Sequence, residues 1–178
     1  INILFRSAQL GYDDAIEKVM PTDAGFCKKV ANSRDVNFKT PLFIASGARH
    51  VKVGSSGGHG QTSLNGNVSY DRQKVIERLV KYGARINKAN QQRETPLYAA
   101  SSQGNEKIVE CLVKYGAEIN RANKNGWTPL YAASSQGHEK IVECLVKYGA
   151  EINRTNDNGW TPLYAASSQG HEKIVECL

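Results

Sequence analysis

Two long stretches of the chain are almost identical, and they decide its fold. Residues 95–123 read TPLYAASSQGNEKIVECLVKYGAEINRAN, and residues 128–156 read TPLYAASSQGHEKIVECLVKYGAEINRTN. They differ at two positions, and a further copy begins at Thr161. The repeat period is therefore 33 residues. Self-similarity at a fixed period of this size predicts a solenoid, in which each repeat stacks on its neighbours.

Each copy predicts a pair of short helices. Thr95 is a favoured helix N-cap, and Pro96 suits the first helical position, where no N–H is required. Gly104 predicts the end of this helix, and an apolar helical pattern follows over residues 106–115. The linking stretch contains Asn125-Gly126, a dipeptide typical of tight turns. Because neither helix is long enough to be stable alone in water, we expect stacking to cover their apolar faces.

The pattern TPLYAA…GH…IV…L…GAEIN resembles the ankyrin repeat, whose usual form is TPLH-x-A-A-x-x-G-H, then an apolar helix, then G-A-D-x-N. The chain departs from the family at its His, which is Tyr98, Tyr131, Tyr164 and, further upstream, Phe43. The resemblance implies an all-α fold, an ankyrin-repeat α-solenoid of helix–turn–helix units linked by β-hairpin-like loops. It also implies that the chain binds other proteins.

The first seventy residues follow the pattern less regularly. Thr40 restarts the motif, but the next TPL comes 55 residues later, 22 more than one period. The surplus contains GSSGGHGQTSLNGN, a composition typical of a loop. We place this loop between a first helix over residues 41–47 and a second over about 72–82.

Upstream of Thr40, residues 4–8 and 15–16 align with the helix pair of a degenerate first repeat. Its Asp35-Val36-Asn37 resembles the family's G-A-D-x-N ending, after a stretch lengthened around residues 26–34. We expect a single domain over residues 1–178. It comprises a degenerate repeat at about 1–37, a repeat at 38–90 with a Gly- and Ser-rich insert at about 48–70, repeats at 91–123 and 124–156, and a truncated repeat at 157–178.

Charge and cysteine content restrict the function classes. The formal net charge is +6, which is mildly basic, and we expect no nucleic-acid partner. No apolar run approaches the ~20 residues of a membrane-spanning helix, so we expect no membrane insertion. Cys111, Cys144 and Cys177 recur with the repeat, in helices whose axes would lie ~8–10 Å apart, too far for disulfides. These positions predict buried free thiols, which favours an intracellular, cytoplasmic location.

Catalytic and cofactor-binding patterns are lacking. In the frame of a phosphate-binding loop, the insert has Gln61 where the lysine would be needed. His50 and His59 lie in or beside the insert, and His138 and His171 occupy the Gly-His positions of the repeat. No CxxC pair occurs, and nothing marks a nucleophile beside a base. We therefore expect no enzyme activity, no cofactor, no metal ion and no small-molecule substrate.

Candidate partner-binding residues repeat with the same period. Trp127 and Trp160 precede the TP motif, where the resembling family presents side chains near the loop fingers and the concave groove. Lys88, Arg121 and Arg154 share one repeat position, so stacking would align them as a ladder of cations. Further basic residues at the same end are Arg85, Arg93 and Lys124. Trp and Arg dominate binding hot spots, but each Trp could instead pack on its neighbouring finger while the cations face solvent.

Three functions remain open from the sequence. The leading one is a protein–protein interaction scaffold that binds a partner, which the basic residues suggest is acidic, through its concave groove and fingers. The identical Ser102-Gln103 and Ser135-Gln136 pairs favour an alternative, a structural spacer or spring segment of a longer ankyrin array. A third is the regulatory repeat region of an enzyme outside this stretch. Because the regular repeats are so alike, residues 1–93 are the better candidate for individual specificity.

Overall fold

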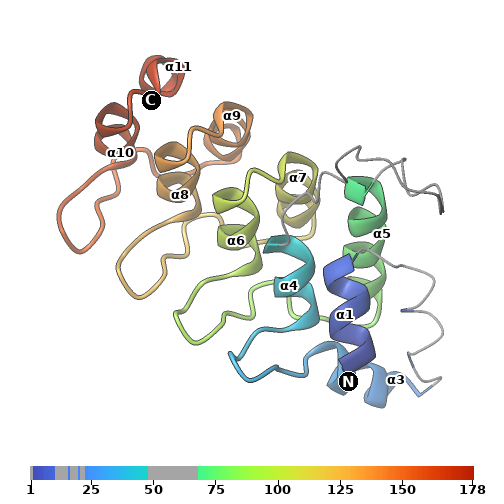
Figure 1. Ribbon diagram of the computed structural model, residues 1–178. Helices are drawn as coiled ribbons and strands as arrows, with labels where there is room; N and C mark the ends of the chain where they lie inside the picture. The colour runs from blue at the N-terminus through green and yellow to red at the C-terminus, as the bar shows by residue number, and fades with distance from the viewer. Residues whose placement is uncertain (1, 11–15, 17–19, 21–22, 48–67) are drawn as a thin grey trace, which may run out of the picture.

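The computed structural model describes residues 2–10, 16, 20, 23–47 and 68–178, which form ten helices and no strand. An inner row packs side by side in the order α1 (Asn2–Leu10), α4 (Pro41–Gly47), α6 (Pro96–Ser102), α8 (Pro129–Ser135) and α10 (Pro162–Ser168). An outer row contains α5 (Val68–Lys81), α7 (Glu106–Lys114), α9 (Glu139–Lys147) and α11 (Glu172–Cys177). Figure 1 shows the two rows running along one stack, with loops projecting from one side. The predicted all-α solenoid is confirmed.

The Thr-Pro motif starts each regular inner helix as predicted. The Thr95 hydroxyl accepts a hydrogen bond from the Tyr98 backbone N–H at 3.1 Å, and Pro96 follows at the first helical position. Gly104 ends the segment with a left-handed φ of 75°. A Cβ at Gly104 would lie 2.7 Å from Cε1 of His138, so glycine is required by both the turn and the next repeat.

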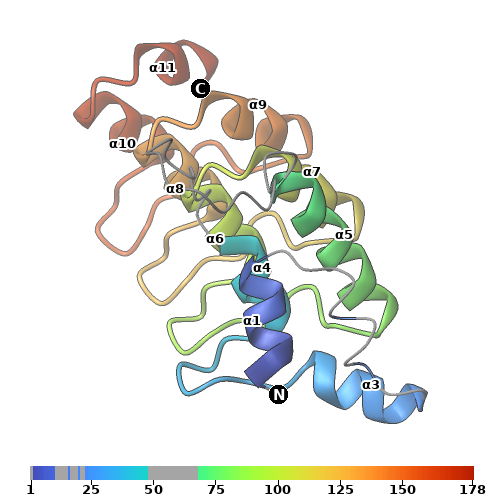
Figure 2. The ribbon, with the colours of Figure 1, turned by 45° about the vertical axis from the view of Figure 1, so that its right-hand side comes forward.

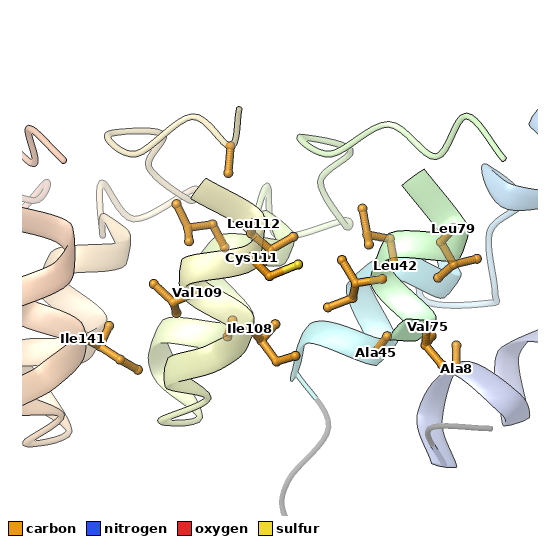
Figure 3. Close-up of a cluster of buried hydrophobic side chains, with 14 of the residues drawn as sticks. Ala8, Leu42, Ala45, Val75, Leu79, Ile108, Val109, Cys111, Leu112 and Ile141 are labelled. Carbon is orange, nitrogen blue, oxygen red and sulfur yellow. The ribbon is translucent and has the colours of Figure 1, made fainter. Parts of the chain in front are cut away.

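The core is continuous from repeat to repeat. Leu42, Leu97 and Leu130 of the inner helices are at most 1% exposed, and Ile108 and Ile141 of the outer helices are equally buried. Figure 3 shows Leu42, Ile108 and Ile141 among the apolar side chains that project between successive helices in one part of the stack. Each helix pair thus buries its apolar face against its neighbours, as a solenoid requires.

Asparagine side chains join successive loops outside this core. The amide of Asn120 donates to the Gly149 carbonyl at 3.2 Å and accepts from the Glu151 N–H at 2.9 Å. Asn87 makes the same pair of bonds to Gly116 and Glu118 one repeat earlier. These residues therefore satisfy backbone groups of the following repeat, which the helices leave unpaired.

The first repeat differs from the sequence-based alignment. Asn32 donates to the Gly83 carbonyl and accepts from the Arg85 N–H, both at 2.8 Å, so it makes the bonds of Asn87 and Asn120. The alignment of Asp35-Val36-Asn37 with G-A-D-x-N is therefore wrong in register. Its cause is helix α3 (Ala24–Ala31), which the sequence analysis did not predict and which leads directly into Asn32.

The irregular second repeat is described only in part. Helix α4 matches the predicted 41–47, whereas α5 begins at Val68, earlier than the predicted 72. The remainder of the predicted insert, with His50, His59 and Gln61, lies outside the described residues, as does residue 15 of the first repeat.

All four cysteines are free thiols, as predicted for the three repeated ones, but the burial of those three is graded. Cys111 is buried, Cys144 is half-buried and Cys177 is exposed. The prediction that all three repeated thiols are buried is therefore wrong for Cys177. The Cys111 thiol lies near Glu77 of α5 and the Cys144 thiol near Glu110 of α7, and exposure of the thiols increases toward the C-terminal end of the stack. Burial also raises the pKa of the Cys111 thiol to about 11, with a contribution from the Glu77 carboxylate.

The asparagine bridges give a first prediction. Replacing Asn120 by Ala removes two inter-repeat hydrogen bonds and should lower the free energy of unfolding by about 1–2 kcal/mol, measured by urea denaturation. Asn153 is the matched control, because it occupies the same repeat position, is exposed and makes no side-chain hydrogen bond within the described residues. Asn153→Ala should change stability by less than ~0.5 kcal/mol. Equal effects of the two substitutions would contradict the bridging role.

The thiol gradient gives a second prediction. At pH 8 an alkylating reagent should modify Cys177 first, Cys144 next and Cys111 slowest. Burial blocks access, and a raised pKa leaves less of the reactive thiolate at this pH. Mass spectrometry of the intact chain would count the modified thiols over time. The Cys177→Ala variant should lose the fast phase, and a fast phase that persists in it would contradict the assignment.

Candidate functional site

The loops that project from the stack are built alike. We define finger 1 as residues 32–39, finger 2 as 83–94, finger 3 as 116–127 and finger 4 as 149–160. Figure 2 shows the four fingers stacked beside one another. At each tip one Asx side chain, from Asp35, Asn90, Asn123 or Asn156, accepts from two backbone N–H groups at 2.8–3.1 Å. The fingers are thus tight turns held by one side chain, without strands among the described residues.

The tips of fingers 1 and 2 hold side chains in an unfavourable backbone conformation. In fingers 3 and 4 the left-handed position is occupied by Gly126 and Gly159, with φ of 74° and 78°. Fingers 1 and 2 have Phe38 and Arg93 there, each with φ of 61°. Left-handed backbone costs a non-glycine residue roughly 1–2 kcal/mol. Such strain often marks a functional position, and here it falls on the two irregular fingers.

The net charge of the fingers falls from finger 2 to finger 4. Finger 2 contains three basic residues and one acid, finger 3 two basic residues and one acid, and finger 4 one basic residue and two acids. Arg85 is the reason for much of this trend, because it stands where the next fingers have Glu118 and Glu151. The basic character is therefore concentrated at the N-terminal side of the row.

Ion pairs make the predicted cation ladder uneven. Arg121 pairs with Glu118 at 3.1 Å, and Arg154 pairs with Glu151 at 3.2 Å. Lys88 occupies the same position in finger 2, but Arg85 stands three residues before it in place of the glutamate, and the described residues give Lys88 no ion pair. These two glutamates were not predicted as partners of the ladder, although their constant spacing of three residues from Arg121 and Arg154 indicates the pairing.

Two hollows between the fingers bring the predicted residues together. The first, which we call the basic hollow, has a volume of about 520 Å³, and among its lining residues all the charged ones are basic. Its charged lining consists of Arg34, Arg85, Lys88 and Arg121. The second, the mixed hollow, has a volume of about 730 Å³ and is lined by acids as well as bases. Its charged lining consists of Arg93, Arg121, Lys124, Arg154, Glu118 and Asp157.

Arg121 lines both hollows, so they form one surface across the fingers. This surface contains all six basic residues singled out from the sequence, and it adds Arg34. Arg34 was not predicted because its finger was misaligned by five residues. A row of guanidinium and ammonium groups in a hollow attracts carboxylate or phosphate groups.

The two tryptophans lie beside the inner helices instead of in either hollow. Trp127 stacks on Tyr131 with ring centroids 5.6 Å apart, and Trp160 stacks on Tyr164 at 5.3 Å. Trp127 is half-buried, and its indole nitrogen is buried without a hydrogen-bond partner in the described structure. The packing role that the sequence left open is thus observed, although against Tyr131 of the same repeat and not a neighbouring finger. Their role in binding stays a prediction.

Tyrosines occupy the position of the family's His on the inner helices. Burial, together with the nearby Glu94 carboxylate and Tyr131, raises the pKa of Tyr98 to about 12. Burial also raises the pKa of Tyr131. Both hydroxyls therefore stay protonated at neutral pH and add no negative charge to this face.

Within the described residues, no cluster of three or more His, Cys, Asp and Glu side chains could hold a metal ion. In the same part of the chain, no helix is long and apolar enough to cross a membrane.

Comparison with known proteins identifies the repeat. A family model described as ankyrin repeats, in three copies, matches residues 50–123 and 121–178. No curated protein matches the chain.

The strained tips give a third prediction. Arg93→Gly should raise the free energy of unfolding by up to ~1 kcal/mol, because relief of the left-handed strain exceeds the added flexibility of the unfolded chain. The reciprocal control is Gly126→Ala, which should be destabilising. Its Cβ would lie 2.7 Å from the Asp157 carboxylate in addition to the strain. A loss of stability in Arg93→Gly, measured by urea denaturation, would indicate that Arg93 serves the fold.

Proposed function

Because the chain belongs to the ankyrin repeat family, whose members are generally protein-interaction modules, we propose that it binds an acidic partner protein through fingers 1–3. The observation that carries this proposal is the basic hollow, whose charged lining is Arg34, Arg85, Lys88 and Arg121 without an acid. The concave groove and finger 4 would add contacts of lower specificity.

Electrostatics support the N-terminal fingers as the contact region. An acidic partner would be steered toward the basic hollow by long-range attraction, which salt screens over ~8 Å at physiological ionic strength. In finger 4, the pairing of Arg154 with Glu151 and the presence of Asp157 reduce this attraction. The three residues of the predicted ladder therefore contribute unequally, and Lys88, together with Arg85 outside the ladder, contributes most.

The regular repeats favour a second role for the C-terminal half. Their inner helices α6, α8 and α10 carry the same PLYAASS sequence, so they present the same groove side chains three times. Such repetition suits a scaffold that sets the length and curvature of the stack. In this proposal the spacer function belongs to the regular repeats and partner choice to the irregular ones.

A charge reversal tests the binding surface. Arg85→Glu gives finger 2 the acid that fingers 3 and 4 already carry, and the new Glu should pair with Lys88 as Glu118 pairs with Arg121. Folding should change little, because exposed ion pairs contribute at most ~1 kcal/mol. We expect capture from a cell extract, quantified by mass spectrometry, to lose its acidic partners in this variant. Raising the salt concentration should weaken the wild-type capture similarly.

Lys107→Glu is the matched control, because it makes the same charge change on the exposed side of α7. Partners kept by Lys107→Glu and lost by Arg85→Glu would support the proposal. Capture that is unchanged in Arg85→Glu at low salt would remove the basic hollow from the binding site. Binding of a random DNA duplex, lost in the same variant, would assign the surface to nucleic acid instead.

A further inference from the structure

We propose that the N-terminal end of the stack holds an anchor site for a large apolar side chain of an acidic segment, next to the basic hollow. The inference rests on the proposed function, since the acidic segment would be part of the partner. The site is a hollow of about 570 Å³ formed by α1, finger 1 and α4, which we call the apolar hollow. Its lining residues are Phe5, Arg6, Gln9, Arg34, Asp35, Val36 and Ile44.

The apolar members of this lining are available to a ligand. Phe5 and Ile44 are half-buried on neighbouring inner helices, and Val36 at the fingertip is 91% exposed. Phe38, at the same tip, is 46% exposed and is held in the left-handed conformation described above. Exposed apolar side chains around a hollow indicate a contact surface more often than an isolated exposed residue does.

The regular repeats lack these features at the same positions. Ile44 stands where α6, α8 and α10 have Ala99, Ala132 and Ala165. Val36 stands where fingers 3 and 4 have the charged residues Lys124 and Asp157. The apolar hollow is thus a property of the irregular N-terminal repeats and not of the repeat pattern.

Charge around the hollow favours an acidic neighbour for the anchor. Arg6 and Arg34 line it, and Lys39 lies in an adjoining hollow that shares Gln9, Asp35 and Ile44 with it. The acid in the lining, Asp35, already accepts two backbone N–H groups through one carboxylate oxygen. The remaining polar rim is therefore predominantly cationic.

Arg34 links the apolar hollow to the basic hollow, because it lines both. Its guanidinium donates to the Ala89 carbonyl of finger 2 at 3.3 Å and lies 5.4 Å from the centroid of the Phe38 ring. A continuous surface therefore runs from Phe5 and Ile44 past Arg34 to Arg85 and Lys88. An extended segment with one large apolar side chain flanked by carboxylates would place the apolar side chain in the apolar hollow and a carboxylate in the basic hollow.

Three fluorescein-labelled peptides test the anchor site by fluorescence anisotropy with the full chain. Their sequences are EEEELFEEEE, EEEESSEEEE and KKKKLFKKKK, so that apolar and charge contributions separate. We expect the first to bind roughly tenfold more tightly than the second, as burial of a large apolar side chain allows, and the third not to bind. Each binding curve should also be recorded for the variants Val36→Lys, Ile44→Ala and Arg85→Glu.

Val36→Lys places at the tip of finger 1 the lysine that finger 3 has at this position, Lys124. It adds a positive charge, so charge alone would strengthen the binding of both acidic peptides. We expect it instead to reduce the affinity for EEEELFEEEE at least threefold and not to reduce that for EEEESSEEEE. Ile44→Ala, the residue of the regular repeats, should act in the same direction. Val175→Lys, the same change at a partly exposed residue of α11, should leave the ratio of the two affinities unchanged.

Equal affinity of the two acidic peptides, or an unchanged ratio in Val36→Lys and Ile44→Ala, would overturn the anchor site. If both acidic peptides then still lose affinity in Arg85→Glu, the proposed function stands without it. If neither acidic peptide binds the unmodified chain, both proposals fail. Equally tight binding of KKKKLFKKKK would overturn the acidic character of the segment.

Discussion

Burial of the inner-helix apolar residues between neighbouring repeats is the interaction on which the rest of this structure depends. Two leucines at one repeat position show this dependence. Leu130 and Leu163 occupy the same repeat position, yet Leu130 is 1% exposed and Leu163 is 40% exposed. The two residues lie in the same helical sequence, PLYAASS, but Leu130 is on α8, which packs between α6 and α10, whereas Leu163 is on α10, which packs on α8 and α11. Stability in such a stack therefore belongs to interfaces more than to single repeats.

The same stacking creates the candidate binding surface. Each finger is held by its own Asx turn, but the asparagine bridges and the packed helices place neighbouring fingers side by side. Residues that are about one repeat apart in sequence, such as Lys88 and Arg121, thereby line a common hollow. Arg85 and Glu118 occupy the same repeat position in fingers 2 and 3. This single difference changes the charge of the surface, while the two fingers keep the same fold.

At the tips of fingers 1 and 2, fold stability favours glycine, whereas binding of a partner favours a large side chain. Glycine at the left-handed position suits the turn, and fingers 3 and 4 have it. Phe38 and Arg93 occupy that position in the fingers beside the apolar and basic hollows, at a cost in backbone strain. Large side chains in a strained backbone conformation are the pattern expected where a side chain is needed for contact with a partner.

Short-range rules are visible in the sequence by itself. The 33-residue period, the Thr-Pro helix starts and the glycine stops depend on residues a few positions apart, so the helix pairs and the solenoid could be predicted from Thr95, Pro96 and Gly104. The basic fingers were also recognisable, because Lys88, Arg121 and Arg154 repeat with the same period.

Other features depend on which surfaces meet, and only the tertiary structure decided them. Helix α3 shifted the first finger, so that Asn32 instead of Asn37 bridges to the next repeat. Cys111, Cys144 and Cys177 lie in the same helical sequence, EKIVEC, yet they are buried, half-buried and exposed respectively. The apolar hollow joins Phe5, Val36 and Ile44 from three separate segments. No local pattern encodes such a meeting, because it arises from the packing of whole repeats, and the burial of each side chain depends on its neighbours in space.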